Sequence, residues 1–134
     1  MSDRATSTIA PGKTATAHTA VTGQNTAKAA GSGSLDVLAT PMMIALMERA
    51  ACNCLADGLE DGQSSVGTHI DVEHTAASPL GAAITATATV AAVDGRKIVF
   101  EVTARDGAGQ IGRGVHTRFV IDAARFMHKA RGRV

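Results

Sequence analysis

The chain has 134 residues, enough for a single domain with a hydrophobic core. A net charge of +1 and the absence of tryptophan and tyrosine exclude the basic surface and stacking side chains of most nucleic-acid-binding proteins. The opening sequence MSDRATSTIAPG lacks an apolar leader, so we expect a cytoplasmic location.

The first 34 residues carry only weak signals of regular structure. Residues 1–11 are small and polar, so we expect a flexible N-terminal lead-in followed by one domain over 12–134. Alanine and threonine alternate over 13–22, which indicates a strand, and 25–30 can form one or two helical turns. The glycine-serine run at 31–34 predicts a flexible loop.

The segment 40–57 predicts the helix around which the rest of the chain is organised. Thr40 can cap its first turn, Pro41 suits the first helical position, and Gly58 supplies a stop. Apolar residues point in nearly every direction, which is typical of a buried helix. Its length of about 25 Å approaches the thickness of a bilayer. However, the charge of Glu48 near its middle and the lack of a second apolar run favour a core helix over a membrane span.

Both cysteines, Cys52 and Cys54, lie in this helix. Residues two apart on a helix point away from each other, so no disulfide is expected between them. We interpret both as small core residues in a reducing cytoplasm.

Four segments with a period of two follow the helix and predict antiparallel strands at 64–75, 82–93, 97–105 and 111–121. Asp94-Gly95 predicts a hairpin turn, and Asp122 can cap a short basic helix that ends near Arg131. The expected inward faces carry Val66, Ile70, Val72 and His74; Ile84, Ala86, Ala88 and Val90; Ile98, Phe100, Val102 and Ala104; and Val115, Phe119 and Ile121.

One apolar helix followed by an antiparallel meander with one apolar face can bury both apolar surfaces if the sheet curls around the helix. We therefore predict an α+β hot-dog fold, with an antiparallel sheet wrapped around a long central helix. The open edges of such a small sheet favour pairing with a second copy of the chain.

Two motif matches do not support a cofactor or a metal. Gly107 to Gly112 fits GxGxxG, but a dinucleotide fingerprint leads from a strand into a helix, and here a β segment follows. A hairpin turn explains it better. The five histidines show neither HExxH spacing nor a partnering CxxC, so no metal site is expected.

Three polar groups are candidates for catalysis. His74 shares its parity with apolar strand residues and should face the helix, and Glu48 carries a charge that is costly there unless it is paired or used. Thr40, eight residues before Glu48, points within about 80° of the same direction. A hydroxyl, a carboxylate and an imidazole can together activate water or a hydroxyl for attack on an acyl carbonyl. The alternatives are a helix cap for Thr40, an ion pair with Arg49 or with an arginine at a subunit contact for Glu48, and a surface position for His74.

Several blocks, in order, carry a family resemblance: LDVLATP at 35–41, MERAA at 47–51, GQSSVGT at 62–68, EHTAASPLG at 73–81 and GRGVHTRF at 112–119. With these blocks, the chain resembles the hot-dog thioesterases of the fluoroacetyl-CoA thioesterase type over nearly its whole length. The resemblance implies a homodimer or a dimer of dimers, with acyl-CoA sites between subunits.

The resemblance also implies roles for individual residues. The family's functional threonine, carboxylate and histidine fall on Thr40, Glu48 and His74, and Gly67 would offer its backbone N–H to the thioester carbonyl. CoA would enter as part of the substrate, and no separate cofactor is implied.

The expected activity is hydrolysis of a short-chain acyl-CoA to free acid and CoA. The loop at 31–34 has no aromatic side chain to close over a small acyl group, so selectivity for a fluorinated substrate is not expected. The CoA phosphates need cations, and the candidates are Arg96, Lys97, Arg113 and Arg118. The alternatives are a non-catalytic acyl-CoA binding hot-dog module and a hot-dog dehydratase.

Overall fold

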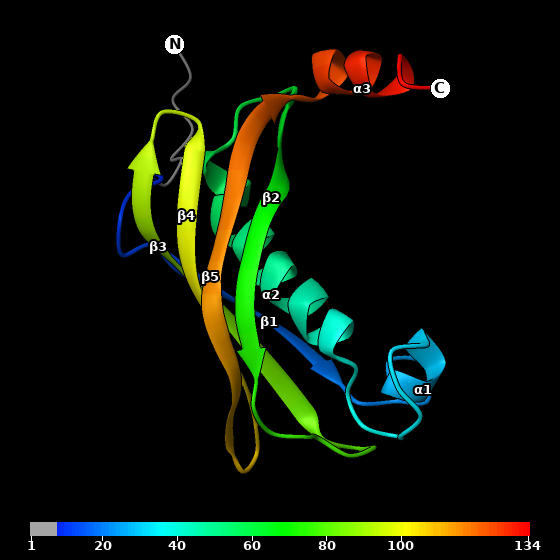
Figure 1. The fold of residues 1–134 in the computed structure, drawn as a ribbon. Helices are drawn as coiled ribbons and strands as arrows, with labels where there is room; N and C mark the ends of the chain where they lie inside the picture. Colours follow the sequence, from blue (N-terminus) through cyan, green and yellow to red (C-terminus); the bar gives the residue numbers. More distant parts are fainter. Residues whose placement is uncertain (1–7) are drawn as a thin grey trace.

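The computed structural model describes residues 8–134 and shows one curved antiparallel sheet with a long helix lying across its concave face (Figure 1). The helix is α2 (Thr40–Leu55), and the sheet has the strand order β1-β3-β4-β5-β2. The strands are β1 (Thr14–Ala20), β2 (Gln63–His74), β3 (Ala83–Asp94), β4 (Lys97–Asp106) and β5 (Gly109–Asp122). The expected α+β arrangement, with a sheet wrapped around a central helix, is therefore confirmed.

Three short helical elements complete the chain: α1 (Ala27–Ala30), the 3-10 turn η1 (Ala56–Gly58) and α3 (Ala123–Arg131). Asp122 caps α3 as expected, because its side chain accepts a hydrogen bond from the backbone N–H of Arg125. In Figure 1, α3 extends away from the sheet at the end of β5. Of the expected N-terminal lead-in, residues 1–7 lie outside the described part, and Ile9 packs against the core.

The hydrophobic core lies between α2 and the concave face of the sheet. The alternation predicted for the two central strands is confirmed, since their inward residues are all buried: Ile84, Ala86, Ala88 and Val90 on β3, and Ile98, Phe100, Val102 and Ala104 on β4. Burial of this apolar surface is the main favourable term in folding and fixes α2 against the sheet. None of the helices in the described residues is long and apolar enough to cross a membrane.

Helix α2 differs in two respects from the helix that the sequence predicts. Ala39 is its N-cap and offers no side-chain hydrogen bond, so Thr40 is not the cap. The helix also buries only one face, because the sheet covers it from one side. Exposed residues follow a stripe along the other face: Met42, Ala45, Arg49 and Cys52. Cys52 is thus not a core residue, whereas Cys54 is buried, and both thiols are free.

Strand β5 presents to the core the face opposite to the one expected. His116 and Arg118 are 1% and 6% exposed, whereas Val115 is 41% exposed. The prediction failed because charged side chains were assigned to solvent, although a histidine and an arginine can be buried when their polar atoms have partners.

Strand β2 contains an irregularity that the sequence pattern did not reveal. The register with β5 shifts between Gly67 and His69, so Thr68 is the extra residue of a β-bulge. Val66 pairs with Phe119 on the outer side of the sheet, whereas Ile70 pairs with the inward-facing His116. Val66 therefore does not share a face with Ile70, contrary to the strict alternation predicted.

The glycine-rich segment that fits GxGxxG is a hairpin turn between β4 and β5, as predicted. Asp106 pairs with Gly109, and its carboxylate accepts hydrogen bonds from the backbone N–H groups of Ala108 and Gly109. The chain then continues as strand rather than helix, so the motif lacks the context of a dinucleotide site.

Candidate active site

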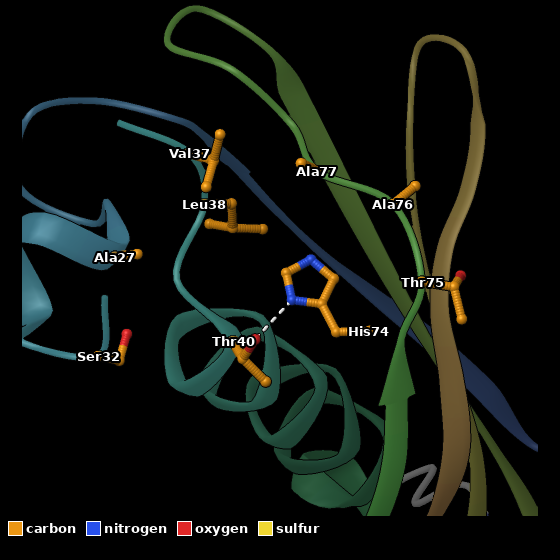
Figure 2. Close-up of a pocket in the computed structure, with 9 residues that line it drawn as sticks. All are labelled: Ala27, Ser32, Val37, Leu38, Thr40, His74, Thr75, Ala76 and Ala77. Carbon is orange, nitrogen blue, oxygen red and sulfur yellow. Dashed lines mark hydrogen bonds between the residues drawn. The ribbon is translucent and has the colours of Figure 1, made fainter. Parts of the chain in front are cut away.

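Thr40 and His74 form the centre of the candidate site. Thr40 lies in the first turn of α2 and His74 is the last residue of β2, and the threonine Oγ1 is 2.7 Å from the imidazole Nδ1. Figure 2 shows both side chains at one cavity, between the start of the helix and the loop that follows the strand. At this distance the two atoms form a short hydrogen bond. The imidazole can therefore orient the hydroxyl or exchange a proton with it.

The second nitrogen of His74 is available for chemistry. Nε2 is buried and makes no hydrogen bond to any residue in the described range 8–134. In Figure 2 it is turned away from Thr40, toward the loop that carries Ala77. Burial lowers the pKa of His74 below its ordinary value of 6.5, and the nearby backbone of Ala76 opposes this shift in part. The imidazole is therefore neutral at physiological pH, the form that acts as a base.

Glu48 lies two helical turns along α2 and belongs to a second polar group. Its Oε2 accepts a hydrogen bond from Nη1 of Arg118 at 3.3 Å and lies 3.9 Å from Nε2 of His116. The Glu48 side chain is 41% exposed, whereas its two partners are almost fully buried. The Glu48 carboxylate is thus partly exposed, while the histidine and the arginine beside it are buried.

Arg118 anchors this second group through all three guanidinium nitrogens. Nε and Nη2 donate to the hydroxyl and the carbonyl of Ser65 at 2.9 and 3.0 Å, and Nη1 also lies 3.2 Å from Nε2 of His116. A planar guanidinium with several partners is held more rigidly than a lysine would be. Because its donors are used here, Arg118 is a poor candidate for a CoA phosphate ligand.

His116 is held in the neutral form. Its Nδ1 donates to the carbonyl of His69 at 2.8 Å, which leaves Nε2 to accept from Arg118. Burial, followed by the neighbouring positive charge of Arg118, lowers its pKa, while the His69 carbonyl and the Glu48 carboxylate oppose the shift. The approach of 3.9 Å to Glu48 is therefore not an ion pair, and Arg118 is the charged partner of that carboxylate.

Gly67 lies in contact with the same group. A methyl group in place of its hydrogen would stand 2.7 Å from Oε2 of Glu48, 3.0 Å from Cε1 of His116 and 3.3 Å from Nη1 of Arg118. A side chain at position 67 would therefore displace the Glu48 carboxylate from this place, and the constraint is one of space rather than of backbone angle.

Within the chain, the structure brings together Thr40 and His74 and separately brings together Glu48 and Gly67. The two pairs are about 12 Å apart along the axis of α2, from the rise of a helix. The predicted trio of Thr40, Glu48 and His74 therefore does not meet in a single chain. Glu48 does pair with an arginine, but the partner is Arg118 of the same chain rather than Arg49 or an arginine at a subunit contact.

Sequence reasoning missed His116 and did not assign Arg118 to the carboxylate. The available signal was parity: both residues share the even positions of β5 with Val120, which is buried. As for metals, the described residues contain no group of three or more histidine, cysteine, aspartate or glutamate side chains that could hold an ion.

The chain has relatives among known protein families and known proteins. Residues 21–124 match the family described as fluoroacetyl-CoA-specific thioesterase. The chain is 45% identical over 96 residues to the fluoroacetyl-CoA thioesterase of Streptantibioticus cattleyicolor, covering 72% of this chain and 69% of that protein.

Solved structures extend this similarity to the fold. The fluoroacetyl-CoA thioesterase FlK superposes with a TM-score of 0.90 at 35% identity, covering 96% of this chain and 99% of FlK. Variants of FlK have been solved with acetyl-CoA and with fluoroacetate and CoA. A hot-dog-like protein from Thermanaerovibrio acidaminovorans, 24% identical, matches with a TM-score of 0.83 over 92% of this chain and 91% of its own, which shows the fold alone. The hot-dog fold is thus confirmed, and the chain belongs to the family of fluoroacetyl-CoA-specific thioesterases.

Proposed function

We propose that this protein hydrolyses a short-chain acyl-CoA thioester to the free acid and CoA. The observation that carries the proposal is the Thr40–His74 pair, 2.7 Å apart, with a buried, unpartnered Nε2 at a cavity. The complexes of FlK with acetyl-CoA and with CoA support this class of substrate. CoA is then part of the substrate, and the reaction needs no further cofactor.

The chemistry follows from the two polar pairs. Neutral His74 acts as a general base or orients the attacking group, and Thr40 positions it by a hydrogen bond. Glu48 either polarises a water molecule or attacks the carbonyl carbon to give a transient anhydride. In both routes the C–S bond breaks, the thiolate of CoA takes up a proton, and water supplies the new oxygen of the acid. The N–H of Gly67 would stabilise the developing oxyanion.

The two pairs can meet only if a second subunit contributes one of them. Strand β2 forms one edge of the sheet, and its residues are exposed or only partly buried, including Ile70 at 36%. An unpaired edge of 12 residues is a template for another strand. We infer a homodimer, alone or as part of a dimer of dimers, in which β2 pairs with the same strand of the partner.

Antiparallel pairing of β2 with its copy would bring opposite ends of the two strands together. With the two-fold axis at Asp71 and Thr68 looped out of the ladder, Gly67 of the partner subunit would lie opposite His74. Each composite site would then contain Thr40 and His74 from one chain and Glu48 and Gly67 from the other. The two free thiols fit the cytoplasmic location proposed for the enzyme.

Release of free thiol from acetyl-CoA and propionyl-CoA tests the function. Thr40→Ala, Glu48→Gln and His74→Ala should each lower kcat at least tenfold, which is within the range expected for loss of a catalytic group. Matched substitutions at exposed positions, Thr103→Ala, Glu101→Gln and His128→Ala, should leave kcat unchanged. Binding of acyl-CoA without thiol release would instead identify a non-catalytic binding module, and hydration of an enoyl-CoA would identify a dehydratase.

Subunit mixing tests the composite site. Thr40→Ala and Glu48→Gln homodimers should both be inactive. After exchange of subunits in an equal mixture, half of the dimers would be mixed and each would hold one intact site, which restores about a quarter of the wild-type activity. No recovery, with exchange verified by mass spectrometry, would show that the two residues act within one chain.

A further inference from the structure

The cavity beside Thr40 and His74 has room for more than a two-carbon acyl group. Its volume is about 280 Å³, and it opens to the surface. It is lined by residues of α1, of the loop before α2, and of the end of β2 with the loop that follows: Ala27, Ser32, Val37, Leu38, Thr40, His74, Thr75, Ala76 and Ala77. Thr40 and His74 form part of the cavity wall. An acyl group whose carbonyl carbon is attacked beside them must therefore occupy this cavity.

The walls away from the catalytic pair are made of small or aliphatic side chains. Figure 2 shows Val37 and Leu38 to one side of the His74 ring, Ala76 to the other side, and Ala77 above the ring between them. All three phenylalanines of the chain lie elsewhere, and there is no tryptophan or tyrosine. Among residues 8–134, the imidazole of His74 is therefore the only aromatic ring in the wall that this chain contributes.

A dry apolar cavity of about 150 Å³ is enough to hold benzene. The space beside His74 is nearly twice that volume. An acetyl group would leave most of it filled with water, and its methyl group would contact few atoms of the wall. A branched or ring-bearing acyl group would instead bury its carbons against Val37, Leu38 and the alanines, which favours its transition state.

We propose that this enzyme prefers acyl groups bulkier than acetyl, namely branched short chains such as isobutyryl and rings up to the size of benzoyl. The proposal rests on the thioesterase function proposed above and names its substrate class. The small side chains at Ser32, Ala76 and Ala77 set the limit on acyl size.

The test compares kcat/KM for acetyl-, isobutyryl- and benzoyl-CoA. One additional methylene in an apolar pocket is worth roughly tenfold or more in discrimination. Wild-type enzyme should therefore hydrolyse isobutyryl-CoA with a kcat/KM at least about tenfold above that for acetyl-CoA. Turnover confined to acetyl-CoA would overturn this proposal alone, whereas no turnover of any ester would overturn the thioesterase function as well.

Filling the cavity provides the second arm. Ala77→Phe and Ser32→Phe, both at exposed loop positions, should lower the ratio of kcat/KM for benzoyl-CoA to that for acetyl-CoA at least tenfold, because the larger acyl group needs the space that the ring would fill. Ala108→Phe, in the exposed β4–β5 turn, is the matched control and should change neither value. Equal losses for all three substrates in the cavity variants would contradict a role in acyl selection.

Discussion

Gly67 and Glu48 fit against each other without space for one further carbon, since a methyl group on Gly67 would lie 2.7 Å from the carboxylate Oε2. On its other side Glu48 accepts a hydrogen bond from Arg118, which a movement of the carboxylate would disturb. The position of the carboxylate is therefore set by a glycine on β2 as much as by its own helix.

Gly67→Ala should displace the Glu48 carboxylate and lower kcat by roughly 100-fold, the scale of a misplacement of about 1 Å. Thiol release from an acyl-CoA measures the loss. Gly107→Ala is the matched control, because a methyl group there would meet nothing within 4 Å. If both variants retain wild-type kcat, the contact between Gly67 and Glu48 has no role in turnover.

Arg118→Met should lower the free energy of unfolding by about 1–3 kcal/mol, because the carbonyl of Ser65 and the carboxylate of Glu48 both lose a charged donor. Much of the Glu48 side chain is exposed, so water replaces part of its lost interaction. Urea unfolding measures the change.

Arg118→Lys should recover little of this loss, since an ammonium group cannot reproduce three separately placed donors. The exposed Arg105 on β4 provides the control, and Arg105→Met should stay within about 0.5 kcal/mol of wild type. Equal stability of the two methionine variants would show that the buried network does not support the fold.

The acid limb of the pH profile should lie below 6.5, because burial lowers the pKa of His74 and the neutral imidazole is the active form. In the profile of kcat/KM, activity should rise as pH increases through the lowered pKa and reach its plateau before an ordinary histidine would. The limb should be lost in His74→Ala, whatever residual activity remains. A midpoint above 6.5 would contradict the neutral, buried state of this ring.

Stability should decrease as pH falls below 6.5. His74 and His116 both have lowered pKa values in the folded state, so the unfolded chain binds more protons in the range between those values and 6.5. The stability that the chain gains from keeping these two histidines neutral is thus complete above pH 6.5 and is lost as the pH falls below that value. Urea unfolding of wild type and of His116→Gln at matched pH values measures this, and the variant should show the shallower dependence.

Much of the fold could be predicted because its signals are local. The alternation of Ile84 to Val90, the Asp94-Gly95 turn and the apolar run after Thr40 each specify one element without reference to the rest of the chain. Thr40 and His74 were also placed correctly at one cleft, since one begins the helix and the other ends an inward-facing strand run.

The environment of Glu48 could not be predicted in the same way. Burial of Arg118 depends on three hydrogen bonds to Ser65 and Glu48, two residues of other elements that lie far from it in sequence. A charge pattern read along β5 alone assigns such a side chain to solvent. The bulge at Thr68 had a local signal that was not used, because an isolated glycine within a strand pattern, here Gly67, often marks a bulge.

That extra residue decides what β2 can contribute. Gly67 and His74 are seven positions apart, an odd number, and in an uninterrupted strand they would point to opposite sides of the sheet. With Thr68 looped out, both pair with inward-facing residues of β5, Arg118 and Gly112. A single strand can thereby supply both kinds of half-site, one near each end, whereas drawing Thr68 into the regular ladder would turn one of them outward and disable every site at once.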